Sequence, residues 1–151
     1  MEVKFTVYGE PVAKGRPRMT RSGHTYTPQK TVNYENLVKL SYQEQVRQKL
    51  DGYISATINA YFAIPKSASK KKQKAMISGE ILPTKKPDTD NIAKAILDSL
   101  NNIAYNDDSQ VTELVVRKYY GEQPRVEVAL KGVKGCTHDR TKATRIQKQS
   151  I

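Results

Sequence analysis

The chain reads Tyr53-Ile54-Ser55-Ala56-Thr57-Ile58-Asn59-Ala60-Tyr61-Phe62-Ala63-Ile64 between Gly52 and Pro65. From Ile54 to Ile64, every second side chain is apolar, and the positions between them are largely polar or tyrosine. Since successive side chains of a strand point to opposite faces, this alternation predicts a half-buried β-strand. Pro65 ends it, because proline has no backbone N–H for a sheet ladder. We therefore expect a sheet built around residues 53–64.

Three more segments alternate in the same way. Residues 2–8 form a predicted strand that Gly9-Glu10-Pro11 breaks. Residues 111–120 and 125–131 form two more, and the four residues Gly121-Glu122-Gln123-Pro124 between them indicate a hairpin.

Helical signals separate these strands. Thr27-Pro28 is typical of an N-cap followed by proline at the first helical position, and apolar residues continue at helical spacing toward Gly52. A short helix follows Ser67 or Ser69 and closes at Gly79. Asp88 or Asp90 caps a third helix, over 91–102. We therefore predict one α+β domain over 1–131, a mixed and largely antiparallel four-stranded sheet with helices packed on it, and a flexible basic tail over 132–151.

The composition points to a polyanionic partner. The 151 residues carry a formal net charge of +11. Such a field attracts nucleic acid first and an anionic membrane second, but the chain has no long apolar run. One cysteine, Cys136, excludes an internal disulfide framework, and no signal-peptide pattern opens the chain. These features predict a protein of a reducing cytoplasm with no membrane partner.

Two basic segments are candidates for contact with DNA phosphates. Residues 11–34 read as a loop with five cationic and no acidic side chains, and residues 66–74 contain a lysine run. A solvated surface is the plain alternative for both. The predicted DNA-binding residues are Lys14, Arg16, Arg18, Arg21, Lys70, Lys71 and Lys72.

Carboxylates gather in two places despite the basic composition. Asp88 and Asp90 stand two positions apart, and Asp108 follows after a predicted helix. Clustered carboxylates suit Mg²⁺ or Mn²⁺, and Lys94, one helical turn after Asp90, could stabilise a scissile phosphate. Each feature also has an ordinary interpretation: an N-cap at Asp88 or Asp90, a surface ion pair between Asp90 and Lys94, and a turn at 106–109. Their co-occurrence in a basic chain favours the metal site.

Other polar residues carry weaker signals. Asp98 is predicted to be a solvated helix residue. His24 and His138 lie in loop-like segments without a second histidine spaced for a metal pair, and Cys136 has no activating neighbour.

The motifs resemble one known family. Residues 86–100 contain Lys86-Pro87-Asp88-Thr89-Asp90-Asn91-Ile92-x-Lys94-x-x-x-Asp98-x-Leu100, and Asn106-Asp107-Asp108-Ser109-Gln110-Val111 follows. Together with Gly9-x-Pro11-x-x-Lys14-x-Arg16-Pro17-Arg18, they resemble the RusA-type Holliday junction endodeoxyribonucleases over residues 1–131.

The resemblance implies a homodimeric, Mg²⁺-dependent enzyme that resolves four-way DNA junctions by paired symmetric nicks and leaves ligatable ends. It implies that Asp88, Asp90 and Asp108 bind the metal and that Lys94 is the essential basic residue. Members are common in bacteria and in phages or prophages. Two alternatives stay open: a metal-dependent nuclease of flaps or plain duplex, and a non-catalytic DNA-binding module.

Overall fold

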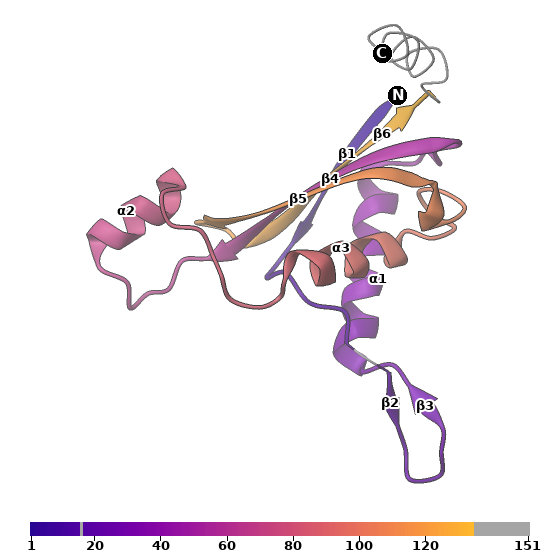
Figure 1. Ribbon diagram of the computed structural model, residues 1–151, viewed down its shortest axis with the longest axis horizontal. Helices are drawn as coiled ribbons and strands as arrows, with labels where there is room; N and C mark the ends of the chain where they lie inside the picture. The colour runs from indigo at the N-terminus through magenta and orange to yellow at the C-terminus, as the bar shows by residue number, and fades with distance from the viewer. Residues whose placement is uncertain (16, 135–151) are drawn as a thin grey trace, which may run out of the picture.

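Strand β4 (Tyr53–Ala63) lies inside a four-stranded sheet with the order β1-β6-β4-β5 (Figure 1). The computed structural model describes residues 1–15 and 17–134 of the chain. The other strands of the sheet are β1 (Glu2–Tyr8), β5 (Val111–Gly121) and β6 (Arg125–Val133). β4 pairs antiparallel with β6 and parallel with β5, and β1 pairs antiparallel with β6. The predicted α+β domain with a mixed, mostly antiparallel sheet is confirmed.

The predicted hairpin between the last two strands is wrong, because β4 lies between β5 and β6. The connecting residues 122–124 cross over the end of β4. Two strand spacings amount to about 10 Å, and three extended residues can span that distance. The connection also lacks the Asn-Gly or Asp-Gly pair that specifies a tight two-residue hairpin. Its Gly and Pro residues therefore mark a chain reversal without specifying which strands pair.

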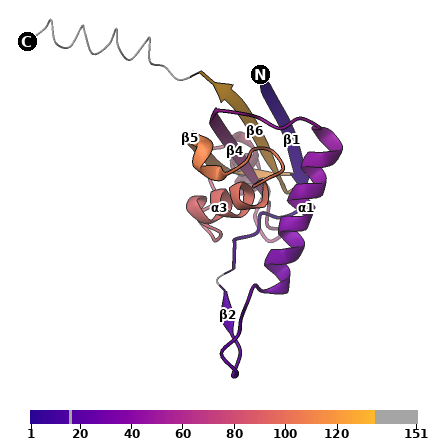
Figure 2. The same cartoon turned by 90° about the vertical axis from the view of Figure 1, so that its right-hand side faces the viewer.

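One face of the sheet is buried under two helices, α1 (Gln29–Gln45) and α3 (Thr89–Ser99) (Figures 1 and 2). The apolar side chains of β4 from Ile54 to Phe62 are at most 1% exposed, as their alternation predicted. They pack with the apolar faces of β1 and β6 and of both helices. α1 lies along β1, whereas α3 lies along β5 and contacts α1.

The boundaries of α1 differ from those predicted. Pro28 is the N-cap, rather than the first helical residue after a Thr27 cap, and no side chain caps the helix. The helix ends at Gln45, well before Gly52, because Val46 adopts an extended conformation. Val46 and Leu50 are still buried, and the Tyr42 hydroxyl donates to the Gln48 carbonyl, which holds the non-helical segment against α1.

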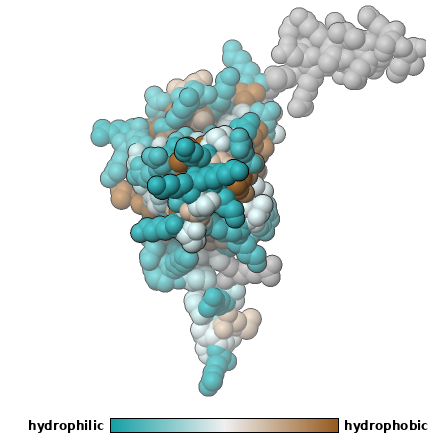
Figure 3. All heavy atoms as spheres, turned by 90° about the vertical axis from the view of Figure 1, so that its left-hand side faces the viewer, coloured by the Kyte–Doolittle hydropathy of each residue, from teal (hydrophilic) through white to brown (hydrophobic). Residues whose placement is uncertain are grey.

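The helix α2 (Lys70–Ser78) begins and ends as its sequence indicates. The Ser69 side chain accepts a hydrogen bond from Lys72 N–H, and Gly79 ends the helix in the left-handed conformation, with φ of 86°. Only Met76 of this helix is buried. α2 therefore projects from the sheet near β5, and Figure 3 shows that the face carrying it is largely hydrophilic.

The basic segment over 11–34 is not only a loop. It contains a two-stranded hairpin, β2 (Arg18–Met19) and β3 (Thr25–Tyr26), which projects beyond the start of α1 (Figures 1 and 2). Gly15 anchors the base of this hairpin, since its N–H donates to Thr31 Oγ1 at 2.8 Å. A Cβ at position 15 would lie 2.6 Å from that oxygen, so the close approach requires glycine.

Strand β6 continues to Val133, two residues past the predicted end of the domain. The rest of the predicted tail, including Cys136 and His138, lies outside the described residues, as does Arg16. Across the part of the chain that the structure describes, no helix is long and apolar enough to span a bilayer.

Candidate metal and DNA-binding site

Helix α3 carries a polar stripe on the face that points away from the core. Asp90, Lys94 and Asp98 are spaced four residues apart, and this spacing places them on one face of the helix. The opposite face is fixed in the core by Ile92, Ile96 and their buried neighbours. The packing of α3 on the sheet therefore determines where these three side chains lie.

At the start of α3, the functional groups are exposed and unengaged. Asp88 occupies the N-cap position, but its side chain makes no capping hydrogen bond. Asp90 and Lys94 form no ion pair with each other. Within residues 1–15 and 17–134, the side chains of Asp88, Asp90 and Lys94 have no polar partner. Neither ordinary interpretation, a side-chain cap or a surface ion pair, accounts for them.

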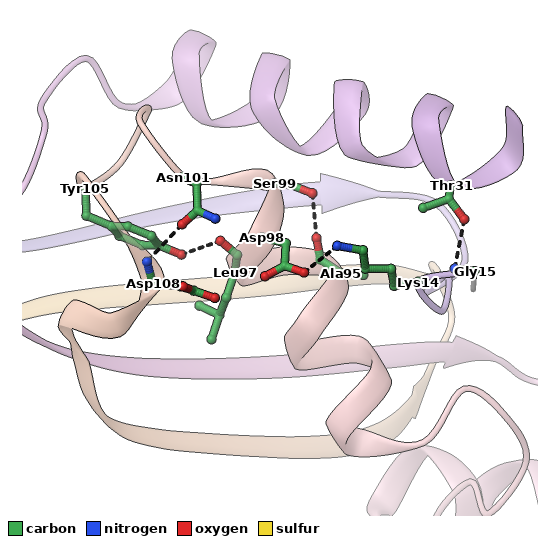
Figure 4. Close-up of polar contacts among 10 residues, drawn as sticks. All are labelled: Lys14, Gly15, Thr31, Ala95, Leu97, Asp98, Ser99, Asn101, Tyr105 and Asp108. Carbon is green, nitrogen blue, oxygen red and sulfur yellow. Dashed lines mark hydrogen bonds and ion pairs between the residues drawn. The ribbon is translucent and has the colours of Figure 1, made fainter. Parts of the chain in front are cut away.

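At the end of α3, a second acidic group is held in place (Figure 4). Lys14 Nζ lies 2.5 Å from Asp98 Oδ2, and the two side chains are only 28% and 23% exposed. The Asp98 carboxyl is also within hydrogen-bonding reach of the Asp108 carboxyl. The prediction that Asp98 is a solvated helix residue is therefore wrong.

Asp108 is positioned by the loop that follows α3. Asn101 Oδ1 accepts a hydrogen bond from Asp108 N–H at 2.8 Å, and the buried Tyr105 hydroxyl donates to the Leu97 carbonyl at 2.6 Å. Partial burial raises the pKa of the Asp108 carboxyl, and the hydrogen bond to Asp98 and the negative charges of Asp107 and Asp98 raise it further. A carboxylate with that surplus of negative charge is suited to a divalent cation.

Asp107 has a different role from its neighbour. It is the N-cap of the 3₁₀ turn η1 (Asp108–Gln110), where its side chain accepts from Ser109 N–H. The Gln110 side chain reaches back to the N–H groups of Asn106 and Asp107. The predicted turn at 106–109 therefore accounts for Asp107, whose side chain caps it. It does not account for the Asp108 side chain, which lies beside Asp98.

The predicted metal ligands do not converge within one chain. Eight residues separate Asp90 from Asp98, which is about 12 Å along an α-helix. Among the described residues, no three His, Cys, Asp or Glu side chains are grouped closely enough to share a metal ion. Each end of α3 nevertheless offers a pair of carboxylates, and Mg²⁺ is commonly bound through one or two carboxylates and several waters. The donor types thus fit Mg²⁺, with the ligands divided between two places.

The predicted DNA-binding residues lie on two separate projections. Arg18 and Arg21 are exposed on the β2–β3 hairpin, and Lys70, Lys71 and Lys72 are exposed on α2. Lys14 lies between the sheet and the hairpin, where Asp98 engages its ammonium group. The exposure of these side chains does not show that they contact DNA, so their assignment as DNA-binding residues stays a prediction.

Sequence reasoning missed Asp98 and the role of Lys14 beside it. Their partnership joins positions 84 residues apart, which no local pattern reveals. One signal was present: Asp98 continues the four-residue spacing of Asp90 and Lys94.

Comparisons with known proteins show the family of the chain. Residues 8–131 match the family described as Endodeoxyribonuclease RusA. The chain is also 44% identical over 137 residues to the uncharacterized protein YqaN of Bacillus subtilis (strain 168). The aligned region covers 87% of this chain and 96% of YqaN. The family match includes both ends of α3, the hairpin and the lysine helix. The chain therefore belongs to the RusA endodeoxyribonuclease family.

Proposed function

We propose that this endodeoxyribonuclease is a Mg²⁺-dependent homodimer that resolves four-way DNA junctions by paired symmetric nicks, with Mn²⁺ as a substitute ion. The observation that carries the proposal is the start of α3, where Asp88, Asp90 and Lys94 are exposed and have no polar partner among residues 1–15 and 17–134. Exposed carboxylates would repel DNA phosphates unless a cation neutralised them. A bound divalent ion would supply charge stabilisation and an activated water for phosphodiester hydrolysis.

The role of each residue follows from its chemistry. Asp88, Asp90 and Asp108 would hold the metal through carboxylate oxygens. Lys94, on the same face of α3 as Asp90, would stabilise the negative charge that develops on the scissile phosphate. The hairpin arginines and the α2 lysines would hold the arms of the substrate on either side.

A homodimer would bring together the carboxylates that lie at opposite ends of α3 in one chain. If two copies of α3 packed antiparallel about a two-fold axis, Asp88 and Asp90 of one protomer would approach Asp98 and Asp108 of its partner. Two equivalent composite sites would result. A four-way junction presents two symmetry-related strands, so paired sites match paired cuts.

Cleavage of a synthetic four-way junction with and without Mg²⁺ tests the proposal. We expect two symmetric nicks with ligatable ends in Mg²⁺ and none in EDTA, and slower cleavage of a flap and of plain duplex. Asp90→Asn should abolish cleavage yet bind the junction as tightly as the wild type or more so, because it removes negative charge beside DNA. Equal rates on all three substrates would favour a general nuclease, and cleavage without a divalent ion would overturn the metal assignment.

A bacterial cytoplasm, or a phage or prophage that replicates there, is the setting we propose for this reaction. A DNA nuclease acts where DNA is, and the net charge of +11 suits a polyanionic partner. Expression with a fluorescent tag in a bacterial host should show the protein over the nucleoid.

A further inference from the structure

The Asp98 carboxylate faces both a cation and a second carboxylate (Figure 4). The cation is the Lys14 ammonium, which reaches Asp98 from the segment that follows β1. The second carboxylate is Asp108, which begins the turn η1. Three chain segments thus bring two negative charges and one positive charge together.

This arrangement differs from an ordinary structural ion pair. Asp98 pairs with one ammonium and lies beside a second carboxylate, so the group of three keeps a net negative charge when both carboxyls are ionised. Lys14 and Asp98 are about three-quarters shielded from solvent. An unbalanced charge is costly when it is partly buried. A carboxylate also has about four lone-pair positions, and the ammonium uses one of those on Asp98. The pair therefore has charge and oxygen atoms available for a second cation.

We propose that Asp98 binds the divalent ion together with Asp108, and that Lys14 is the cation that Asp98 gives up when the metal arrives. This inference rests on the proposed metal-dependent function and adds a fourth carboxylate to its site. Lys14 is then a positioning residue that holds Asp98 toward Asp108 in the metal-free protein. This role replaces the DNA contact predicted for Lys14 from the sequence.

The proposal makes opposite predictions for the two partners of one ion pair. Removing Asp98 removes a metal ligand, so metal affinity should fall. Removing Lys14 removes a competing cation from the same oxygen atoms, so metal affinity should rise. If the pair only fastened the hairpin to α3, both variants would break the same ion pair and metal affinity would change in the same direction.

Binding of Mn²⁺ to the full-length, DNA-free protein, measured by electron paramagnetic resonance, tests this without reference to activity. Asp98→Asn should weaken Mn²⁺ binding by about tenfold or more, as losses around metal sites commonly do. Lys14→Gln should tighten it, and a gain in affinity cannot arise from misfolding. Asp98→Glu, which keeps the carboxylate, should retain more affinity than Asp98→Asn.

Two matched variants control for net charge. Asp107→Asn removes the same charge beside Asp108 but leaves Asp98 in place, and Lys30→Gln removes a lysine charge on the exposed surface of α1. Both should change Mn²⁺ affinity much less than the variants of Asp98 and Lys14.

The outcomes separate this inference from the proposed function. Asp98→Asn with wild-type Mn²⁺ affinity, or a loss of affinity in Lys14→Gln, overturns the role of Asp98 while leaving Mg²⁺-dependent cleavage by the wild type intact. A wild type that neither binds Mn²⁺ nor cleaves a junction in Mg²⁺ overturns both.

Discussion

Lys94 is one of the few lysines of this basic protein for which the structure suggests a chemical role. It stands one turn after Asp90 on the exposed face of α3 and has no polar partner among the residues described. An unpaired ammonium beside exposed carboxylates is free to approach a phosphate that a metal brings to the same place.

Lys94→Ala should therefore slow cleavage by about 10²–10³-fold, as loss of a charge-stabilising donor commonly does. Its affinity for the junction should hardly change, because a contact made in the transition state acts on rate. Single-turnover cleavage with saturating enzyme measures the rate, and a gel-shift in Ca²⁺ measures binding. If Lys94→Ala cuts at the wild-type rate once the DNA is saturated, its assigned role is wrong.

Asp108 and Asp107 should affect the stability of the metal-free protein in opposite directions. Burial and negative neighbours raise the pKa of Asp108 in the folded chain, so its ionisation opposes folding above the ordinary value of 3.8. Hydrogen bonds from Ser109 lower the pKa of Asp107, so its ionisation favours folding.

Thermal unfolding in EDTA between pH 3 and pH 7 would check this. Asp108→Asn should raise the melting temperature at pH 7, and the gain should disappear below the ordinary pKa, where Asp108 is protonated in both states. Asp107→Asn should lower the melting temperature at pH 7. This decrease should become smaller in acid, as the pH falls through the lowered pKa of Asp107. The same sign for both variants at pH 7 would contradict the electrostatic account.

Among the three α-helices, α2 has the smallest share in the core, since only Met76 of this helix is buried. Its lysines make it a candidate platform for the phosphates of one DNA arm. Because so little of the fold depends on α2, its charges can be changed without disturbing α3.

Replacing Lys70, Lys71 and Lys72 together by alanine should lower junction affinity and reduce the slope of log affinity against log salt by about one for each phosphate that the protein no longer binds. The cleavage rate at saturation should stay near that of the wild type. Replacing Lys4, Lys49 and Lys131, which are exposed lysines outside α2, is the matched control. Equal salt slopes in the two triple variants would show that α2 is only a solvated surface.

The elements themselves were largely predictable, because their signals are local. Alternation located β4, Gly79 located the end of α2, and the start of α2 was narrowed to Ser67 or Ser69, of which Ser69 is the cap. The neighbours of β5 were not predictable, since a connection that contains Gly121 and Pro124 reverses the chain whether or not the strands on its two sides pair. Likewise, the motif located Asp88, Asp90 and Asp108, but the contact between Lys14 and Asp98 depends on how distant segments pack.

For the whole molecule, the division of the ligands between the ends of α3 makes the proposed dimer testable by subunit mixing. In a heterodimer of Asp90→Asn with Asp108→Asn, composite sites would place both changes in one site and leave the other intact. Sites formed within each chain would both be damaged.

We therefore expect this heterodimer, prepared by co-expression with two affinity tags, to nick one strand of a junction. The reciprocal control pairs the Asp90→Asn/Asp108→Asn double variant with a wild-type protomer. Composite sites predict that this control is inactive, whereas sites within one chain predict one nick. The opposite pattern of activity would show that each protomer carries a complete site.

The strand order also has a consequence for synthesis of the chain on the ribosome. Among the strands that the structure describes, β1 pairs with β6 alone, and Glu2 faces Lys131 across that ladder. At ordinary translation speeds, the first strand waits about 6 to 26 s for its partner to be made. During that time, its apolar side chains and both of its hydrogen-bonding edges are open to other nascent chains. Since β6 also borders β4, a transcript cut short before Arg125 yields a product in which half of the sheet cannot assemble.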